Sequence, residues 1–128
     1  MNRTVLIVED TEPGRDMLEM ALMHLPGIEI HAVGTAEEAM DFLASPQASA
    51  PITALVTDLN LPQMDGFQLI EAVRAQPRWS ELPIVVISGN SDPRTLDRVV
   101  SLGASAYFPK PYSPAQVRQK LEELIDAP

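Results

Sequence analysis

Five polar residues lie at the ends of short apolar runs in this sequence. Glu9 and Asp10 directly follow one run, Asp58 follows a second, Ser88 ends a third and Lys110 comes just after a fourth. Crowded carboxylates repel one another unless a cation lies among them, and oxygen ligands without nearby His or Cys suit Mg²⁺. Beside such an ion, the ammonium of Lys110 would neutralise phosphoryl oxygens while the Asp58 carboxylate attacks phosphorus in line. If the runs are neighbouring strands, these side chains therefore predict Mg²⁺-dependent phosphoryl transfer to Asp58.

The apolar runs alternate with helical patterns along the whole chain. The strand-like runs cover residues 4–8, 28–33, 53–57, 83–88 and 104–108. Between them, apolar residues recur at helical spacing, as at Ala36, Ala39, Met40 and Leu43. Five β–α units in succession predict right-handed crossovers and a doubly wound α/β fold, a five-stranded parallel sheet with five helices on its two faces. The carboxyl ends of parallel strands meet at one edge of the sheet, which would gather the five polar residues.

The polarity of the runs predicts their places in the sheet. The runs 4–8, 53–57 and 83–88 are largely apolar and should lie centrally, whereas 28–33 alternates between apolar and polar residues and should lie at an edge. Capping signals mark the starts of the last four helices, at Thr35, Asp65, Asp92 and Ser113. The first helix is expected from near Gly14 to Leu25, before Pro26 and Gly27.

The composition excludes several other kinds of function. The 128 residues carry a net charge of −9, so direct binding of nucleic acid is not expected. The absence of Cys excludes disulfides, thiolate catalysis and Cys-based zinc sites. The longest apolar runs, 5–8 and 84–87, are far too short for membrane insertion, and the N-terminus lacks the apolar stretch of a signal peptide. We therefore expect a single cytoplasmic domain over residues 1–128.

Four segments carry a resemblance to a known family. They are VLIVED (5–10), ALVTDLNLPQMDG (54–66), PIVVISG (83–89) and GASAYFPKPY (103–112). In chemistry, spacing and order, the chain resembles the receiver domain of two-component response regulators, from Val5 to about Ile125. The resemblance implies the strand order 2-1-3-4-5 of that fold.

The resemblance also implies roles for residues at the magnesium site. Asp58 corresponds to the aspartate that a partner kinase phosphorylates. Asp10 corresponds to a direct Mg²⁺ ligand, Glu9 to a residue that acts through water, and Asn60 to one that offers its backbone carbonyl to the metal. Glu9 replaces the commoner Asp, but it keeps the oxygen that the metal needs.

Three further residues correspond to those that bind the phosphoryl group or respond to it. Lys110 would pair with the phosphoryl group, Ser88 would hydrogen-bond to it, and Tyr107 would change rotamer when the Ser88 hydroxyl moves. Ser88 replaces the commoner Thr, and we expect the missing methyl group to weaken the coupling to Tyr107. Because Lys110 must turn sharply to point at Asp58, we predict a cis Lys110–Pro111 peptide bond.

The expected partners follow from the same resemblance. No Gly-rich phosphate loop is present, so a histidine kinase or a histidine phosphotransfer protein would hold the phosphoryl donor. A downstream protein target, or an effector domain outside this sequence, would read the face formed by the fourth helix, fifth strand and fifth helix. This face would include Arg94, Arg98, Tyr107 and Gln119, and a homodimer could form through it.

Two alternatives come from other classes of protein. An aspartate-dependent phosphohydrolase of small phosphate esters would use Asp58 as its nucleophile, but position 60 is Asn where such an enzyme needs an acid/base carboxylate. A pseudo-receiver would dock partners without phosphorylation, and the intact acidic set argues against it. Magnesium binding would separate the pseudo-receiver from the phosphoacceptor.

Overall fold

The strands of the structure form one parallel sheet. The computed structural model describes residues 3–45, 50–89 and 92–126. The strands are β1 (Arg3–Val8), β2 (Ile28–Val33), β3 (Ile52–Asp58), β4 (Ile84–Ser88) and β5 (Ala106–Pro109). Their order is β2-β1-β3-β4-β5, with parallel pairing throughout. The doubly wound α/β fold, the strand order and the edge position of β2 are as predicted.

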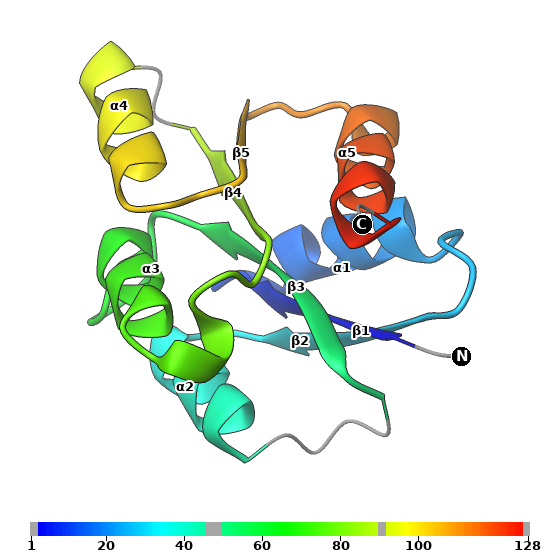
Figure 1. Ribbon diagram of the computed structural model, residues 1–128. Coiled ribbons are helices and arrows are strands. Elements are labelled where there is room, and N and C mark those ends of the chain that lie inside the picture. Colours follow the sequence, from blue (N-terminus) through cyan, green and yellow to red (C-terminus); the bar gives the residue numbers. More distant parts are fainter. Residues whose placement is uncertain (1–2, 46–49, 90–91, 127–128) are drawn as a thin grey trace.

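Helices cover both faces of this sheet (Figure 1). They are α1 (Glu12–Leu22), α2 (Ala36–Ala44), α3 (Gly66–Arg74), α4 (Pro93–Ser101) and α5 (Pro114–Asp126), with a short 3₁₀ helix η1 (Pro77–Trp79) before β4. One core lies under α1 and α5, where Leu22 and Leu121 are fully buried. The other lies under α2, α3 and α4, where Leu43, Ile70 and Val99 are fully buried. Within the described ranges, no helix is both long and apolar enough to cross a membrane.

The predicted caps hold the helices in place. The Thr35 hydroxyl accepts a hydrogen bond from the Glu38 amide, and Asp65 forms a reciprocal capping box with Gln68. In α1 the boundary differs from the prediction, since the helix begins at Glu12 and its N-cap is Thr11. This cap places the first turn of α1 directly beside the carboxyl end of β1.

The strand β5 also starts later than the sequence predicted. The expected run began at residue 104, whereas the strand covers Ala106–Pro109. The Ala104 amide still donates to the Val99 carbonyl, at the end of α4. Gly103 adopts a φ of 101°, which permits the turn between the helix and the strand. Residues 103–105 therefore complete this turn before the chain enters the sheet.

Candidate functional site

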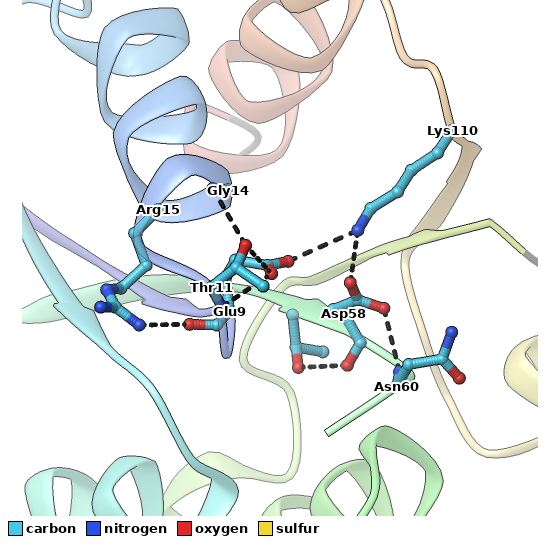
Figure 2. Close-up of polar contacts among 8 residues, drawn as sticks. Glu9, Thr11, Gly14, Arg15, Asp58, Asn60 and Lys110 are labelled. Atoms are coloured by element: carbon cyan, nitrogen blue, oxygen red, sulfur yellow. Dashed lines mark hydrogen bonds and ion pairs between the residues drawn. The ribbon is translucent and has the colours of Figure 1, made fainter. Parts of the chain in front are cut away.

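Three of the predicted site residues are buried at the carboxyl ends of central strands. Glu9 follows β1, Asp58 ends β3 and Ser88 ends β4. Their exposed fractions are 3%, 4% and 0%, respectively. Because β1, β3 and β4 are adjacent in the sheet, residues far apart in sequence meet at one edge. Figure 2 shows Glu9 and Asp58 facing the same lysine there.

Lys110 reaches this edge from the segment after β5. Its Nζ lies 2.5 Å from Asp58 Oδ2 and 3.5 Å from Glu9 Oε2 (Figure 2). Its backbone N–H donates to the Ser88 carbonyl over 2.8 Å, which continues the pairing beyond β4 and β5. The Lys110–Pro111 peptide bond is cis, as predicted. Lys110 is therefore the counterion that the two buried carboxylates share.

Sharing one ammonium leaves the carboxylates incompletely neutralised. Burial raises the pKa of Glu9 and the nearby Asp58 carboxyl raises it further, although Thr11 and Lys110 oppose this shift. Burial acts to lower the pKa of Lys110, but Asp58 and Glu9 outweigh it and raise that pKa. Two buried negative charges thus face one partly exposed positive charge, and a further cation would be electrostatically favoured.

Asp10 does not join the buried carboxylates. Its side chain is exposed at the turn after β1. Among the described residues, no group of three His, Cys, Asp or Glu side chains is placed to hold a metal ion, which differs from the predicted convergence of three carboxylates. The physical reason is that the Lys110 ammonium attracts Glu9 and Asp58, while Asp10 is solvated. Glu9 and Asp58 still provide an oxygen-only donor pair with excess negative charge, which fits a Mg²⁺ ion that keeps most of its waters.

Asn60 contacts Asp58 through its backbone. Its amide N–H donates to Asp58 Oδ1 over 2.9 Å (Figure 2), while Lys110 binds Oδ2 of the same carboxylate. Both carboxylate oxygens of Asp58 are therefore oriented by donors. The role of the Asn60 backbone carbonyl as a metal ligand remains a prediction.

Ser88 and Tyr107 lie on the same face of the sheet. Tyr107 of β5 pairs with Val86 of β4. Side chains alternate along a strand, so Ser88 points to the same face as Val86. Tyr107 is half-buried and packs against the core under α2, α3 and α4. This arrangement is compatible with contact between the two side chains, and their switching role remains a prediction.

The first turn of α1 supplies contacts that the sequence analysis missed. The N–H and the hydroxyl of Thr11 lie 3.2 and 3.0 Å from Glu9 Oε1 and donate to it. Arg15 Nη1 donates to the Glu9 carbonyl over 2.9 Å, and Gly14 donates its N–H to the Thr11 hydroxyl oxygen (Figure 2). The sequence does contain a signal for this turn, because a Thr two residues before a Pro, as in Thr11 and Pro13, is typical of a helix start.

An apolar cavity of about 390 Å³ borders the site. Met17, Leu18, Ile87 and Pro111 form much of its wall, and Glu9, Lys110 and Tyr112 also line it. The Tyr112 hydroxyl is buried and has no hydrogen-bond partner among the described residues. Burial raises the pKa of Tyr112, with Lys110 acting to lower it and Glu9 to raise it. The charged residues of the site thus lie directly beside an apolar surface.

Comparisons with known proteins agree with this architecture. The family model for the response regulator receiver domain matches residues 5–122. The chain is 31% identical over 121 residues to the chemotaxis protein CheY1 of Helicobacter pylori, covering 94% of this chain and 95% of that protein. It is also 31% identical to the transcriptional regulatory protein GltR of Pseudomonas aeruginosa, covering 96% of this chain and 49% of that protein.

A solved structure gives the same result for the fold. A putative response regulator from Chloroflexus aurantiacus superposes with a TM-score of 0.87 at 28% identity, covering 98% of both chains. The family match and the structural match both extend over nearly the whole chain. The chain therefore belongs to the response regulator receiver domains, the CheY-like signalling modules of two-component systems.

Proposed function

We propose that Asp58 accepts a phosphoryl group from a phosphohistidine of a histidine kinase or a histidine phosphotransfer protein. The observation that supports this most directly is the Lys110 ammonium, which lies 2.5 Å from the buried Asp58 carboxylate and also pairs with Glu9. A structural ion pair would need one carboxylate. Here the ammonium also pairs with a second carboxylate, Glu9, and each Asp58 oxygen accepts a hydrogen bond, so the polar groups are directed at the Asp58 carboxylate.

The chain's own residues would carry the transfer as follows. An Asp58 oxygen attacks phosphorus as the P–N bond of the phosphohistidine breaks, and the bonding electron pair remains on the imidazole nitrogen. Lys110 neutralises charge on the phosphoryl oxygens, and the Ser88 hydroxyl donates to one of them. The Asn60 N–H fixes the orientation of the Asp58 carboxylate before attack. Hydrolysis of the acyl phosphate would later return the domain to its resting form.

Mg²⁺ fits the oxygen donors at this edge. Asp58, Asp10 and the Asn60 carbonyl would bind it, and Glu9 would act through water. When bound, the ion supplies positive charge that stabilises the transferring phosphoryl group. The excess negative charge of Glu9 and Asp58 supports this assignment, and the side chain of Asp10, the residue after Glu9, is exposed.

The output surface is proposed to be the face formed by α4, β5 and α5. Leu96 and Val100 of α4 are 43% and 60% exposed, and they give this face apolar area that a partner or a second copy would cover. Arg98 of α4 lies 3.9 Å from the centre of the Phe67 ring of α3, so movement of α4 would change this contact. Phosphorylation would then shift the population of this face through Ser88 and Tyr107.

A phosphorylation assay tests the proposal. The purified domain is incubated with acetyl phosphate, with and without Mg²⁺, and its intact mass is measured. We expect a gain of one phosphoryl group that requires Mg²⁺ and is lost in Asp58→Asn, which keeps the shape but not the nucleophile. The matched control Asp65→Asn, at the cap of α3, should be labelled normally. Absence of labelling in the native domain would favour the docking-only alternative, and turnover of phosphate esters without a labelled intermediate would favour the phosphohydrolase.

A further inference from the structure

We propose that Thr11 is a positioning residue that fixes the carboxylate of Glu9 at the metal edge of the site. The inference rests on the proposed function, because it concerns the Mg²⁺ site in which Glu9 takes part. Thr11 donates two hydrogen bonds to the same oxygen, Glu9 Oε1, from its backbone N–H at 3.2 Å and from its hydroxyl at 3.0 Å. With Oε1 held in this way, Oε2 is the oxygen that faces Lys110.

The Thr11 hydroxyl is itself held in one orientation. Its oxygen accepts a hydrogen bond from the Gly14 N–H over 3.1 Å, as the N-cap of α1 (Figure 2). A hydroxyl has one proton, so accepting from Gly14 leaves that proton available for Glu9 Oε1. The helix start and the carboxylate are thus coupled through a single side chain.

Gly14 provides the space that this arrangement needs. A Cβ at position 14 would lie 2.6 Å from both Cγ and Cδ of Glu9 and 2.7 Å from its Oε1, closer than such atoms approach in proteins. Gly14 lies inside the first turn of α1, where glycine is a poor helix former. We infer that its small size accommodates the Glu9 side chain.

The length of Glu9 explains why it needs this support. Glutamate has one more rotatable side-chain bond than aspartate, so its carboxylate loses more conformational freedom when it is held at a metal site. Two donors from Thr11 and the close packing of Gly14 restrict those rotations before any ion binds. Thr11 therefore prepares Glu9 for Mg²⁺ without touching the ion itself.

Magnesium titrations of matched variants test the inference. Binding is followed by backbone-amide NMR shifts of Asp58 and Asn60 in the native domain and in Thr11→Val, Thr11→Ser and Thr35→Val. Thr11→Val removes the hydroxyl and should weaken Mg²⁺ binding roughly tenfold, the lower end of what the loss of an outer-shell hydrogen bond costs a metal site. Thr11→Ser keeps the hydroxyl and should retain the native affinity. Thr35→Val removes an equivalent N-cap from α2 and should leave the affinity unchanged.

A double variant shows whether the effect passes through Glu9. In the Glu9→Ala background, Thr11→Val should change the Mg²⁺ affinity less than twofold. Equal affinity of Thr11→Val and the native domain would overturn the inference, as would an undiminished tenfold loss in the Glu9→Ala background. If the native domain itself shows no Mg²⁺-dependent shifts, the proposed metal site fails instead, so the two failures are distinguishable.

Gly14 gives an independent measurement without metal. Gly14→Ala should lower the melting temperature of the native domain because the new Cβ displaces Glu9. The same change in the Glu9→Ala background should raise the melting temperature, since alanine is the better helix former. A rise of equal size in both backgrounds would show that Glu9 does not occupy this space.

Discussion

The Lys110 ammonium lies 2.5 Å from Asp58 Oδ2, although the two residues are 52 positions apart in the chain. The contact joins the ends of β3 and β5, which are separated in the sheet by β4. Because Glu9 approaches the same ammonium from the end of β1, one lysine connects three strands of the sheet. The stability of the metal-free domain should therefore depend on this side chain.

Replacing Lys110 tests that dependence. Lys110→Met leaves Glu9 and Asp58 buried without a counterion, so the free energy of unfolding in the absence of Mg²⁺ should fall by about 1–2 kcal/mol. The partial exposure of Lys110 keeps this estimate below that for a fully buried pair. Urea unfolding at neutral pH measures the change.

The control for this prediction is Lys120→Met. Lys120 pairs with Glu123 on the surface at 3.7 Å, and its loss should change the free energy of unfolding by less than about 0.5 kcal/mol. Equal effects of the two substitutions would show that Lys110 is an ordinary surface lysine.

Glu9 should give the stability a characteristic pH dependence. Burial and the neighbouring Asp58 raise the pKa of Glu9 in the folded state, so the folded protein binds this proton more tightly than the unfolded chain. Ionisation of Glu9 therefore reduces the free energy of unfolding as the pH rises from the unfolded pKa through the folded pKa. Without Mg²⁺, Glu9→Gln should be more stable than the native domain at pH 7.

The pH profile distinguishes this effect from a change in packing. The advantage of Glu9→Gln should disappear below about pH 4, where Glu9 is protonated in both states. Urea unfolding at several pH values gives the comparison. An advantage that stays constant across this range would argue for a packing effect and against the carboxylate charge.

Tyr112 carries a hydroxyl that is buried without a partner in the described structure. Tyr112→Phe removes an unsatisfied polar group and keeps the ring against the cavity, so the free energy of unfolding should stay the same or rise by up to about 1 kcal/mol. Thermal unfolding of Tyr112→Phe and of Tyr107→Phe gives the comparison. A clear loss of stability in Tyr112→Phe would contradict this account and would show that the hydroxyl makes a stabilising hydrogen bond.

Switching should extend from the site to α4. Beryllofluoride with Mg²⁺ imitates the phosphoryl group at Asp58, and the coupling to the distant face should be about 1–3 kcal/mol. Backbone-amide NMR shifts should therefore change at Ser88, Tyr107 and residues 94–101. Shifts confined to the site would mean that beryllofluoride binds but that Ser88 and Tyr107 do not transmit its effect.

Ser88→Thr, which adds the missing methyl group, should strengthen the coupling between Asp58 and Tyr107.

Much of the fold could be predicted from the sequence because its signals are local. Apolar runs of strand length and caps such as Thr35 and Asp65 placed the sheet and most helices, and they brought Glu9, Asp58, Ser88 and Lys110 to one edge. The boundary of β5 was less accurate because Gly103 and Ala104 complete a turn whose hydrogen bonds reach back to α4.

The detailed site depends on contacts that a sequence does not display. Asp10 was expected beside Glu9 and Asp58, but those two carboxylates share the Lys110 ammonium and Asp10 is exposed. The role of Thr11 depends on the side-chain conformation of Glu9, and this conformation in turn depends on Lys110 and Gly14. Residue types indicated the chemistry that we propose, whereas the orientation of the side chains required the three-dimensional arrangement.

The central claim is that Asp58 forms an acyl phosphate, and chemical trapping of that bond tests it most directly. The domain is phosphorylated with acetyl phosphate and Mg²⁺, reduced with borohydride, digested and sequenced by mass spectrometry. An acyl phosphate is reduced to an alcohol, so the account predicts homoserine at position 58, with the Asp10 and Asp65 side chains unchanged. Homoserine at another position, or phosphate retained on Ser88 with Asp58 intact, would contradict the account.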